Sequence, residues 1–214
     1  MGRRALPKLD PALDLSRHFK TWEDLPQPWN AALLFQRDAP LEVEVGSGKG
    51  LFLDSAARGM PEHNFLGIEI AKNYARFSAA RLAKKSLTNA VMVHGNGERL
   101  FGELLPDNSL TAVHVYFPDP WWKKRHRKRR VMNARFLQDV VRTLKPEGKL
   151  HFWTDVEEYF AVTLELIAAS TPLVGPLEVE EKEATHDLDF RTHFERRMRL
   201  NGEPVYRSEF VKRP

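Results

Sequence analysis

The sequence predicts a doubly wound α/β domain with a mostly parallel sheet and an antiparallel pair of strands at one edge. Short apolar runs alternate with amphipathic stretches from about residue 41, and a glycine-rich turn follows the first run. The most continuous apolar run, LTAVHVYF at 110–117, is typical of a central strand buried on both faces. With 214 residues and 42% hydrophobic content, the chain is long enough for one domain with a substantial core.

The first half of this domain is expected to contain three strands and the helices that connect them. LEVEV at 41–45 predicts the first strand, and a helix is expected at about 49–58. NFLGIEI at 64–70 predicts the second strand, and helical periodicity follows it at 74–82. AVMVH at 90–94 predicts the third strand, before a short helix.

The second half continues the alternation and ends differently. A helix at about 133–144 follows the fourth strand, and the sequence Lys-Pro-Glu-Gly at 145–148 predicts its end. KLHFWT at 149–154 predicts the fifth strand, and 156–169 predicts another helix. Asn-Gly at 201–202 is typical of a hairpin turn, which predicts the antiparallel edge pair.

Composition excludes several kinds of function. The absence of cysteine excludes disulfides, thiolate metal sites and cysteine nucleophiles, and is compatible with a cytosolic protein. The N-terminus has no apolar signal region, and no run approaches the ~18 apolar residues that a membrane span needs. We therefore expect a soluble cytoplasmic protein with no membrane partner and no metal ion.

Positive charge is concentrated in one short stretch. KKRHRKRR at 123–130 contains seven Lys or Arg residues and no acid. Without these seven charges, the formal net charge of +4 becomes −3. A concentrated basic patch on a slightly acidic body favours a polyanionic partner, because each neutralised phosphate releases counterions. A solvated or localisation-type tract is the alternative.

The glycine-rich turn, Glu-Val-Gly-Ser-Gly-Lys-Gly at 44–50, predicts a nucleotide-type ligand. A phosphate-binding P-loop does not fit, because Gly50 follows Lys49 where that motif needs Ser or Thr. A dinucleotide fingerprint fits poorly, because Leu51 stands where its third glycine belongs. S-adenosylmethionine fits better: it has no phosphate, and Glu44 could face its positively charged end. A purely structural turn is the alternative.

Polar side chains also close the next two strands. Glu69 ends the second strand, where a carboxylate commonly accepts both ribose hydroxyls. Asn96 follows the third strand, where an amide can hydrogen-bond an adenine edge, and Glu98 competes for that role. Each alone is as well explained as a strand-end cap. Their position at successive strand ends beside the glycine turn favours one ligand site.

A stiff corner follows the fourth strand, in the sequence FPDPWW at 117–122. Pro118 and Pro120 restrict the backbone on both sides of Asp119, and so orient its carboxylate. Trp121 and Trp122 can stack on a base or on the guanidinium groups that follow. A structural Pro-Trp corner is the alternative if the loop is taken alone.

The motifs LEVEVGSGKG, NFLGIEI, VYFPDPWWKKRHRKRR, HFWTDVEEYF and RTHFERR extend from residue 41 to 197. With them, the chain resembles the bacterial tRNA (guanine-N7)-methyltransferases of the TrmB family. The resemblance implies the seven-stranded, class I (Rossmann-like) fold of S-adenosylmethionine-dependent methyltransferases at 41–214, and an RNA-contacting N-terminal segment at 1–40. It implies methylation of N7 of the variable-loop guanosine, tRNA position 46, by a monomer or homodimer.

The resemblance also implies residue roles. The residues expected to bind S-adenosylmethionine are Glu44, Gly46, Gly48, Glu69, Asn96 and Asp119. The residues expected to contact the substrate guanosine are Lys123, Asp155, Thr192 and Glu195. The residues expected to hold the RNA backbone are Lys124, Arg125, His126, Arg127, Lys128 and Arg129. Thr192-x-x-Glu195 can equally be a helix capping box, and Asn96 stands where an Asp is also common in the family.

The chemistry of N7 gives Asp119 its expected catalytic role. Guanine N7 has an in-plane lone pair, so no base needs to deprotonate it, and its methylation produces a cationic purine. Catalysis should then come from alignment and from a carboxylate that stabilises the developing charge. Two other functions stay open: methylation of an exocyclic amino group, and non-catalytic RNA binding on the same fold.

Overall fold

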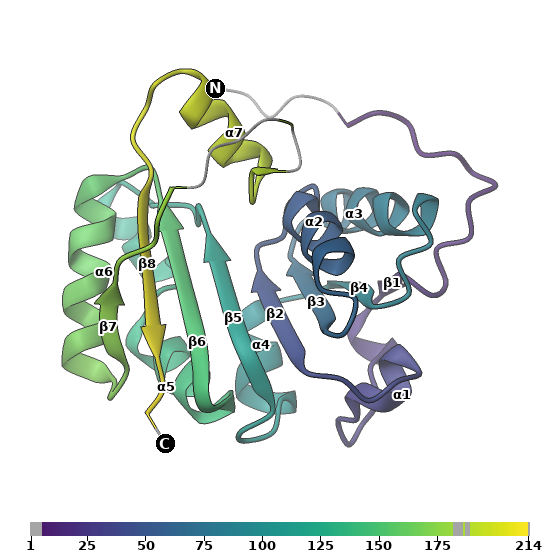
Figure 1. Ribbon diagram of the computed structural model, residues 1–214, viewed down its shortest axis with the longest axis horizontal. Helices are drawn as coiled ribbons and strands as arrows, with labels where there is room; N and C mark the ends of the chain where they lie inside the picture. The colour runs from purple at the N-terminus through teal and green to yellow at the C-terminus, as the bar shows by residue number, and fades with distance from the viewer. Residues whose placement is uncertain (1–5, 182–185, 187–188, 214) are drawn as a thin grey trace.

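The computed structural model describes residues 6–181, 186 and 189–213. Eight strands of this part form one sheet in the order β1-β4-β3-β2-β5-β6-β8-β7 (Figure 1). Their bounds are β1 Phe19–Lys20, β2 Leu41–Val45, β3 Asn64–Glu69, β4 Ala90–His94, β5 Leu110–Tyr116, β6 Leu144–Thr154, β7 Val174–Leu177 and β8 Tyr206–Val211.

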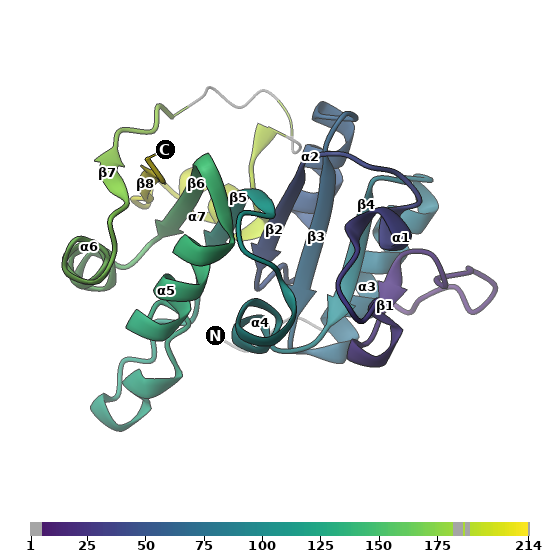
Figure 2. The ribbon, with the colours of Figure 1, turned by 90° about the horizontal axis from the view of Figure 1, so that it is seen from below.

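Helices cover both faces of the sheet. The α-helices are α1 Ala31–Phe35, α2 Leu51–Gly59, α3 Lys72–Lys84, α4 Gly97–Arg99, α5 Ala134–Thr143, α6 Glu157–Ser170 and α7 His193–Leu200. Short turns of 3₁₀ helix occupy Trp22–Asp24 and Lys124–Arg129, and a π-helical turn occupies Leu100–Leu104. One core cluster joins α2 and α3 to one face, and the other joins α5 and α6 to the opposite face (Figures 1 and 2).

The strand pairing confirms the predicted topology. The ladders from β1 through β6 are parallel, whereas β8 is antiparallel to both β6 and β7. β5 lies between β2 and β6, and all but one of its residues are buried, as expected for the central strand. The strand order reverses between β2 and β5, and this is where open α/β sheets bind ligands, beyond the carboxyl ends of the strands.

The N-terminal segment contributes to the same sheet and core. β1 pairs with β4 in parallel, and Leu25 and Phe35 are buried in the α5 and α6 side of the core. Residues 1–5 of the expected RNA-contacting segment lie outside the described residues. The described part of that segment is therefore packed on the domain rather than held apart from it.

Two local expectations were wrong. Asn201-Gly202 does not form a hairpin: it ends α7, where Gly202 has a φ of +68° and its N–H donates to the Arg199 carbonyl at 3.1 Å. Asn-Gly favours left-handed backbone at a helix end as readily as in a hairpin, so the dipeptide alone does not decide. β6 begins at Leu144 rather than at 149. Leu144 already pairs with Leu110 of β5, and the register shift between Leu110 and Ala112 leaves residues 145–148 as a bulge in the strand.

Within the described residues, every helix is too short or too polar to cross a membrane.

Candidate active site

Four predicted site residues lie at one edge of the sheet. Glu44 is the second-last residue of β2, Glu69 ends β3, Asn96 follows β4, and Asp119 follows β5. Because β4, β3, β2 and β5 are neighbouring parallel strands, their carboxyl ends meet. Helix α7 crosses above this edge (Figure 1). The topology therefore brings together the four residues that the sequence placed at strand ends.

Glu44 is a buried carboxyl group with an unsatisfied oxygen. Its exposed fraction is 3%, and its Oε2 atom accepts no hydrogen bond from the described residues. Burial raises the pKa of Glu44 to about 8; the Ser47 hydroxyl opposes this shift, and the negative charge of Glu69 adds to it. A buried acceptor without a donor is costly, so this carboxyl group is suited to a cationic or N–H-bearing ligand.

The glycines of the turn differ in what surrounds them. Gly46 and Gly48 have φ values of +83° and +52°, and no atom lies within 4 Å of a Cβ built on either. Gly50 also has a positive φ, but a Cβ there would overlap the Ser78 side chain of α3. Gly50 therefore permits close packing of α2 on α3, whereas Gly46 and Gly48 border open space that a ligand can enter.

Glu69 connects the turns that follow β2 and β3. Its Oε2 accepts the backbone N–H of Gly48 at 2.9 Å, and its Oε1 accepts the N–H of Ala71 at 2.8 Å. Each carboxylate oxygen retains a second lone pair for a hydroxyl group. Ile70, which follows, is 72% exposed and presents an apolar surface at the site. Ile70 lies just beyond the strand that the sequence predicts to include it, and its place after the strand-end acid is the signal for a role at the site.

Asn96 combines a structural role with a free amide. Its Oδ1 accepts the N–H of Glu98 at 2.9 Å and caps α4, whereas its Nδ2 donates to no residue of the described part. The competing acid, Glu98, accepts a 2.6 Å hydrogen bond from Asn133 at the start of α5. Asn96 therefore offers a ligand an N–H donor, whereas Glu98 offers only carboxylate acceptors, of which Oε1 already accepts from Asn133.

The Phe-Pro-Asp-Pro-Trp corner is strained. Phe117 and Trp121 have φ values of +51° and +46°, a left-handed conformation that costs of order 1–3 kcal/mol for such residues. The Phe117 N–H donates to the Trp153 carbonyl at 2.8 Å, which extends the β5–β6 ladder into the corner. Asp119 is exposed at its tip. The surrounding structure thus holds a carboxylate in the open at a fixed place, as expected of a functional acid.

The basic run forms a short 3₁₀ helix, and some of its exposed cations have partners within the protein. The Arg127 guanidinium pairs with Glu158 at 3.0 Å, and that of Arg129 lies 5.0 Å from the Trp121 ring centroid. Trp121 also meets the His126 ring edge-on at 5.8 Å. Trp122 is 62% exposed. The two adjacent tryptophans are thus divided: Trp121 braces the loop, and Trp122 projects from it.

Thr192 forms the helix cap that a capping box predicts, but the Glu195 side chain accepts the N–H of Arg191 rather than that of Thr192. Thr192 caps α7, and its Oγ1 accepts the Glu195 N–H at 3.0 Å. The Glu195 carboxylate is 2% exposed and accepts the Arg191 N–H at 2.6 Å. Arg199 and Arg207 each lie 3.4 Å from its Oε1. Glu195 is therefore engaged within the protein and anchors α7 above the strand ends.

The two other residues expected at the guanosine differ in exposure. Asp155 follows β6 and is half-buried; burial raises its pKa, and the positive charge of Arg197 opposes that shift. Lys123 is exposed at the start of the 3₁₀ helix. Asp155 thus joins the edge of the sheet that carries Glu44 and Asp119, while Lys123 stands at the entry to the basic loop.

Comparison with known proteins matches this geometry to one family. The family model described as "Putative methyltransferase" (Methyltransf_4) matches residues 38–208. A tRNA (guanine-N(7)-)-methyltransferase of Rhodopirellula baltica is 55% identical over all of this chain and 81% of its own length. The corresponding Legionella pneumophila protein (strain Corby) is 35% identical over 89% of this chain and 85% of its own. The chain belongs to the tRNA (guanine-N7-)-methyltransferase family.

Solved structures agree at the level of the fold. A SAM-dependent methyltransferase from Aquifex aeolicus superposes with a TM-score of 0.55 at 13% identity, over 82% of this chain and 84% of its own. This confirms the Rossmann-like methyltransferase fold that the resemblance implied. β1 adds a two-residue strand beside β4 to the seven strands expected.

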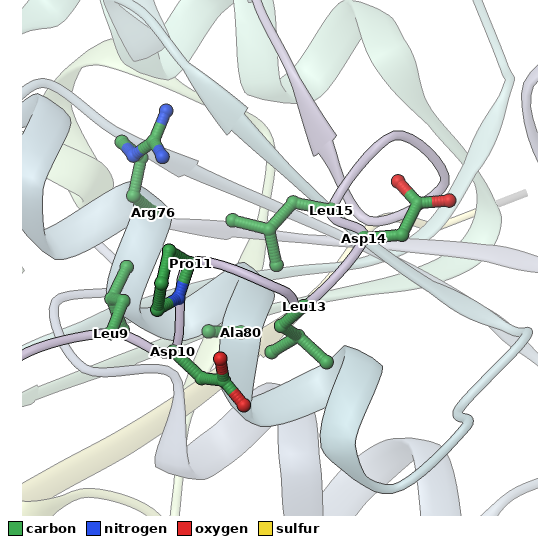
Figure 3. Close-up of a pocket in the computed structure, with 8 residues that line it drawn as sticks. All are labelled: Leu9, Asp10, Pro11, Leu13, Asp14, Leu15, Arg76 and Ala80. Atoms are coloured by element: carbon green, nitrogen blue, oxygen red, sulfur yellow. The ribbon is translucent and has the colours of Figure 1, made fainter.

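A pocket of about 400 Å³ lies away from these residues (Figure 3). It is formed where the N-terminal segment crosses α3. Its lining residues are Leu9, Asp10, Pro11, Leu13, Asp14, Leu15, Arg76 and Ala80. None of the residues expected at the methyltransferase site is among them.

The buried acid makes stability depend on pH in a defined direction. With a pKa of about 8 when folded and 4.5 when unfolded, Glu44 binds a proton in the native state that the unfolded state has lost. The free energy of unfolding should therefore fall between about pH 4.5 and 8, by about 4 kcal/mol. Glu44→Gln should remove this loss, so the variant gains stability relative to wild type as pH rises. Thermal unfolding of both proteins from pH 4 to 9 measures it.

The matched control is Glu62→Gln, which changes an exposed glutamate in the loop before β3. Its pH profile should parallel that of the wild type. A parallel profile for Glu44→Gln as well would contradict the shifted pKa of Glu44.

Proposed function

We propose that this protein transfers the methyl group of S-adenosylmethionine to N7 of guanosine 46, in the variable loop of tRNA. Family membership supports the reaction type. The observation that carries the assignment to this site is the unpartnered Oε2 of buried Glu44 beside the open glycine turn. S-adenosylmethionine carries the ammonium that such an acceptor requires, and the sulfonium that supplies an electrophilic methyl group.

The residues at the ends of β2, β3 and β4 fit the parts of this cofactor. Glu44 accepts hydrogen bonds from the ammonium, and the remaining lone pairs of Glu69 accept the ribose hydroxyls. The free amide of Asn96 suits the polar edge of adenine, and exposed Ile70 offers an apolar surface to its ring. Gly46 and Gly48 leave room for the backbone to approach the ligand.

Asp119 and Asp155 are the acids available to the guanine. Asp119 stabilises the positive charge that develops on the purine ring as N7 is methylated, and no proton abstraction is needed. Asp155 accepts hydrogen bonds from the N1–H and N2–H edge. Thr192 and Glu195 already have hydrogen-bond partners within the protein, so they would have to give up those partners to contact the guanine. With their present partners, the two residues hold α7 above the place where the guanine would bind.

The basic loop beside Asp119 suits the tRNA backbone. The ammonium groups of Lys123, Lys124 and Lys128 pair with no acid in the described part of the chain, and Arg125 faces solvent. The contribution of Arg127 should be smaller, because Glu158 already neutralises it. The loop thereby delivers the variable-loop guanosine to the acid at the end of β5.

One incubation tests the proposed function. Protein, methyl-labelled S-adenosylmethionine and unmodified tRNA should yield 7-methylguanosine on digestion, and a tRNA with adenosine at position 46 should yield none. Label in N2-methylguanosine would instead identify an exocyclic-amino methyltransferase. Tight tRNA binding with no calorimetric binding of S-adenosylmethionine would identify a non-catalytic RNA-binding protein.

Trp122 should stack on a tRNA base, whereas Trp121 should not. Trp122→Ala should weaken tRNA binding about 5- to 100-fold, the range for loss of one base–aromatic stack, with little effect on the salt dependence of binding or on thermal stability. Trp121→Ala removes the support for Arg129 and His126, so it should lower the stability of the loop as well. Equilibrium binding and thermal unfolding of both variants separate the two roles. Wild-type affinity in Trp122→Ala would exclude the stack.

A further inference from the structure

The last arginine of the basic run points into the protein. The Nε–H of Arg130 donates to the Pro120 carbonyl at 2.7 Å, and its guanidinium lies 4.5 Å from the Tyr159 ring centroid. Arg130 is half-buried, whereas Lys128 and Arg129 before it are exposed. The Arg130 side chain thus contacts both Pro120, the residue directly after Asp119, and Tyr159 in the first turn of α6.

Of the two groups that Arg130 contacts, Tyr159 is anchored in the core and the Pro120 carbonyl belongs to the strained corner. Tyr159 is 1% exposed, and its ring packs edge-on against Phe152 of β6 with centroids 5.8 Å apart. The Pro120 carbonyl lies between exposed Asp119 and the left-handed Trp121. The Arg130 bridge therefore connects the rigid core to the outer half of a strained corner.

The inner half of that corner has its own anchor. The Phe117 N–H donates to the Trp153 carbonyl, and the Phe117 ring lies 4.9 Å from that of Phe194 on α7. Asp119 itself makes no hydrogen bond or ion pair within the described residues. The position of its carboxylate thus depends on the anchors on either side, and Arg130 provides the outer one.

We infer that Arg130 is a positioning residue for Asp119 and not a contact to the tRNA backbone. The inference rests on the proposed function, in which Asp119 must meet the reacting guanine. A displacement of about 1 Å in an aligned group can cost up to ~100-fold in rate. Loss of the Arg130 bridge should therefore slow methyl transfer while leaving the electrostatic attraction for tRNA in place.

A lysine should not replace Arg130. The guanidinium lies over the Tyr159 ring while its Nε–H donates to the Pro120 carbonyl, and a lysine ammonium on its flexible stem cannot hold both contacts in this geometry. A cation that only meets phosphate tolerates this change far better. Arg130→Lys therefore distinguishes positioning from phosphate binding at constant charge.

The experiment compares Arg130→Lys and Arg130→Met with the same changes at Arg125, the exposed cation in the same loop. For each variant, single-turnover methyl transfer is measured at saturating tRNA and S-adenosylmethionine, and tRNA binding is measured against salt. Both Arg130 variants should lower the saturated rate about tenfold or more, with an unchanged salt slope. Arg125→Met should lower the magnitude of the slope by about one, and Arg125→Lys should preserve it.

Two results would contradict the positioning role of Arg130, and a third would contradict the proposed function. A wild-type saturated rate in Arg130→Lys, or a salt slope in Arg130→Met that drops as in Arg125→Met, would overturn the positioning role. Thermal unfolding and S-adenosylmethionine binding confirm that each variant is folded. If Arg130→Met does not fold, the rate of Arg130→Lys alone tests the positioning role. Absence of tRNA methylation by the wild-type protein would instead refute the proposed function, and this inference with it.

Discussion

Asp119→Ala should lower the single-turnover rate of methyl transfer about 100- to 1,000-fold, while tRNA affinity changes by no more than about twofold. The expected decrease in rate follows from the loss of one preorganised charge that stabilises the transition state. Asp119 is exposed and makes no hydrogen bond or ion pair within the described residues, so its removal should not disturb the fold. Rapid-quench assays at saturating substrates and equilibrium tRNA binding measure the two quantities separately.

Two further variants sharpen this test. Asp119→Asn keeps the size of the side chain and removes its charge, so its rate should fall nearly as far as that of the alanine variant. Asp38→Ala removes an exposed acid before β2, at the opposite edge of the sheet, and should leave the rate unchanged. Equal losses of rate and tRNA affinity in Asp119→Ala would show that the residue binds tRNA rather than stabilising the reacting base.

Neutralising the outward cations of the basic loop should have the second large effect, and it should be on binding. The triple replacement of Lys124, Arg125 and Lys128 by methionine removes three charges that no acid in the described part of the chain pairs with. The slope of log affinity against log salt should decrease by about 2 to 3, and affinity near physiological salt should fall about 10- to 100-fold. Filter binding across a salt series measures both.

Two matched triples define the interpretation. A second triple, in which Lys124, Arg125 and Arg127 are replaced by methionine and Lys128 is kept, should change the slope less. The reason is that Arg127 is already paired with Glu158. Neutralising Lys84, Arg135 and Lys145, which are exposed on other elements, removes the same net charge and should leave the slope nearly unchanged. If the loop triple and this distant triple behave alike, net charge rather than the loop attracts tRNA.

Much of the architecture could be predicted because its signals are local. LEVEV, AVMVH and LTAVHVYF are short segments rich in valine and other apolar residues, which favour strands, and the structure has strands at all three. The glycines after β2 indicated left-handed backbone, and Gly46, Gly48 and Gly50 all have positive φ. Once parallel strands were predicted, the meeting of their carboxyl ends followed from topology.

Prediction failed where one local sequence was compatible with two structures and distant residues selected between them. Asn201-Gly202 carries the same local preference for a hairpin and for a helix end, and only packing of α7 above the sheet selected the second. Thr192 and Glu195 matched both a capping box and a guanosine contact. Arg207 on β8 and Arg199 on α7 now engage the Glu195 carboxylate, and the chain order around 192–195 does not indicate either partner.

The stretch FPDPWWKKRHRKRR shows the same division within fourteen letters. The amino-acid order alone predicts that an oriented acid, two aromatics and a dense positive charge follow the central strand. It does not predict that Trp121 packs against the loop while Trp122 projects from it, that Arg127 is paired, or that Arg130 braces the corner. Composition and periodicity specify which groups are present, whereas the direction of each side chain depends on Glu158, Tyr159 and the strained backbone, which come together only on folding.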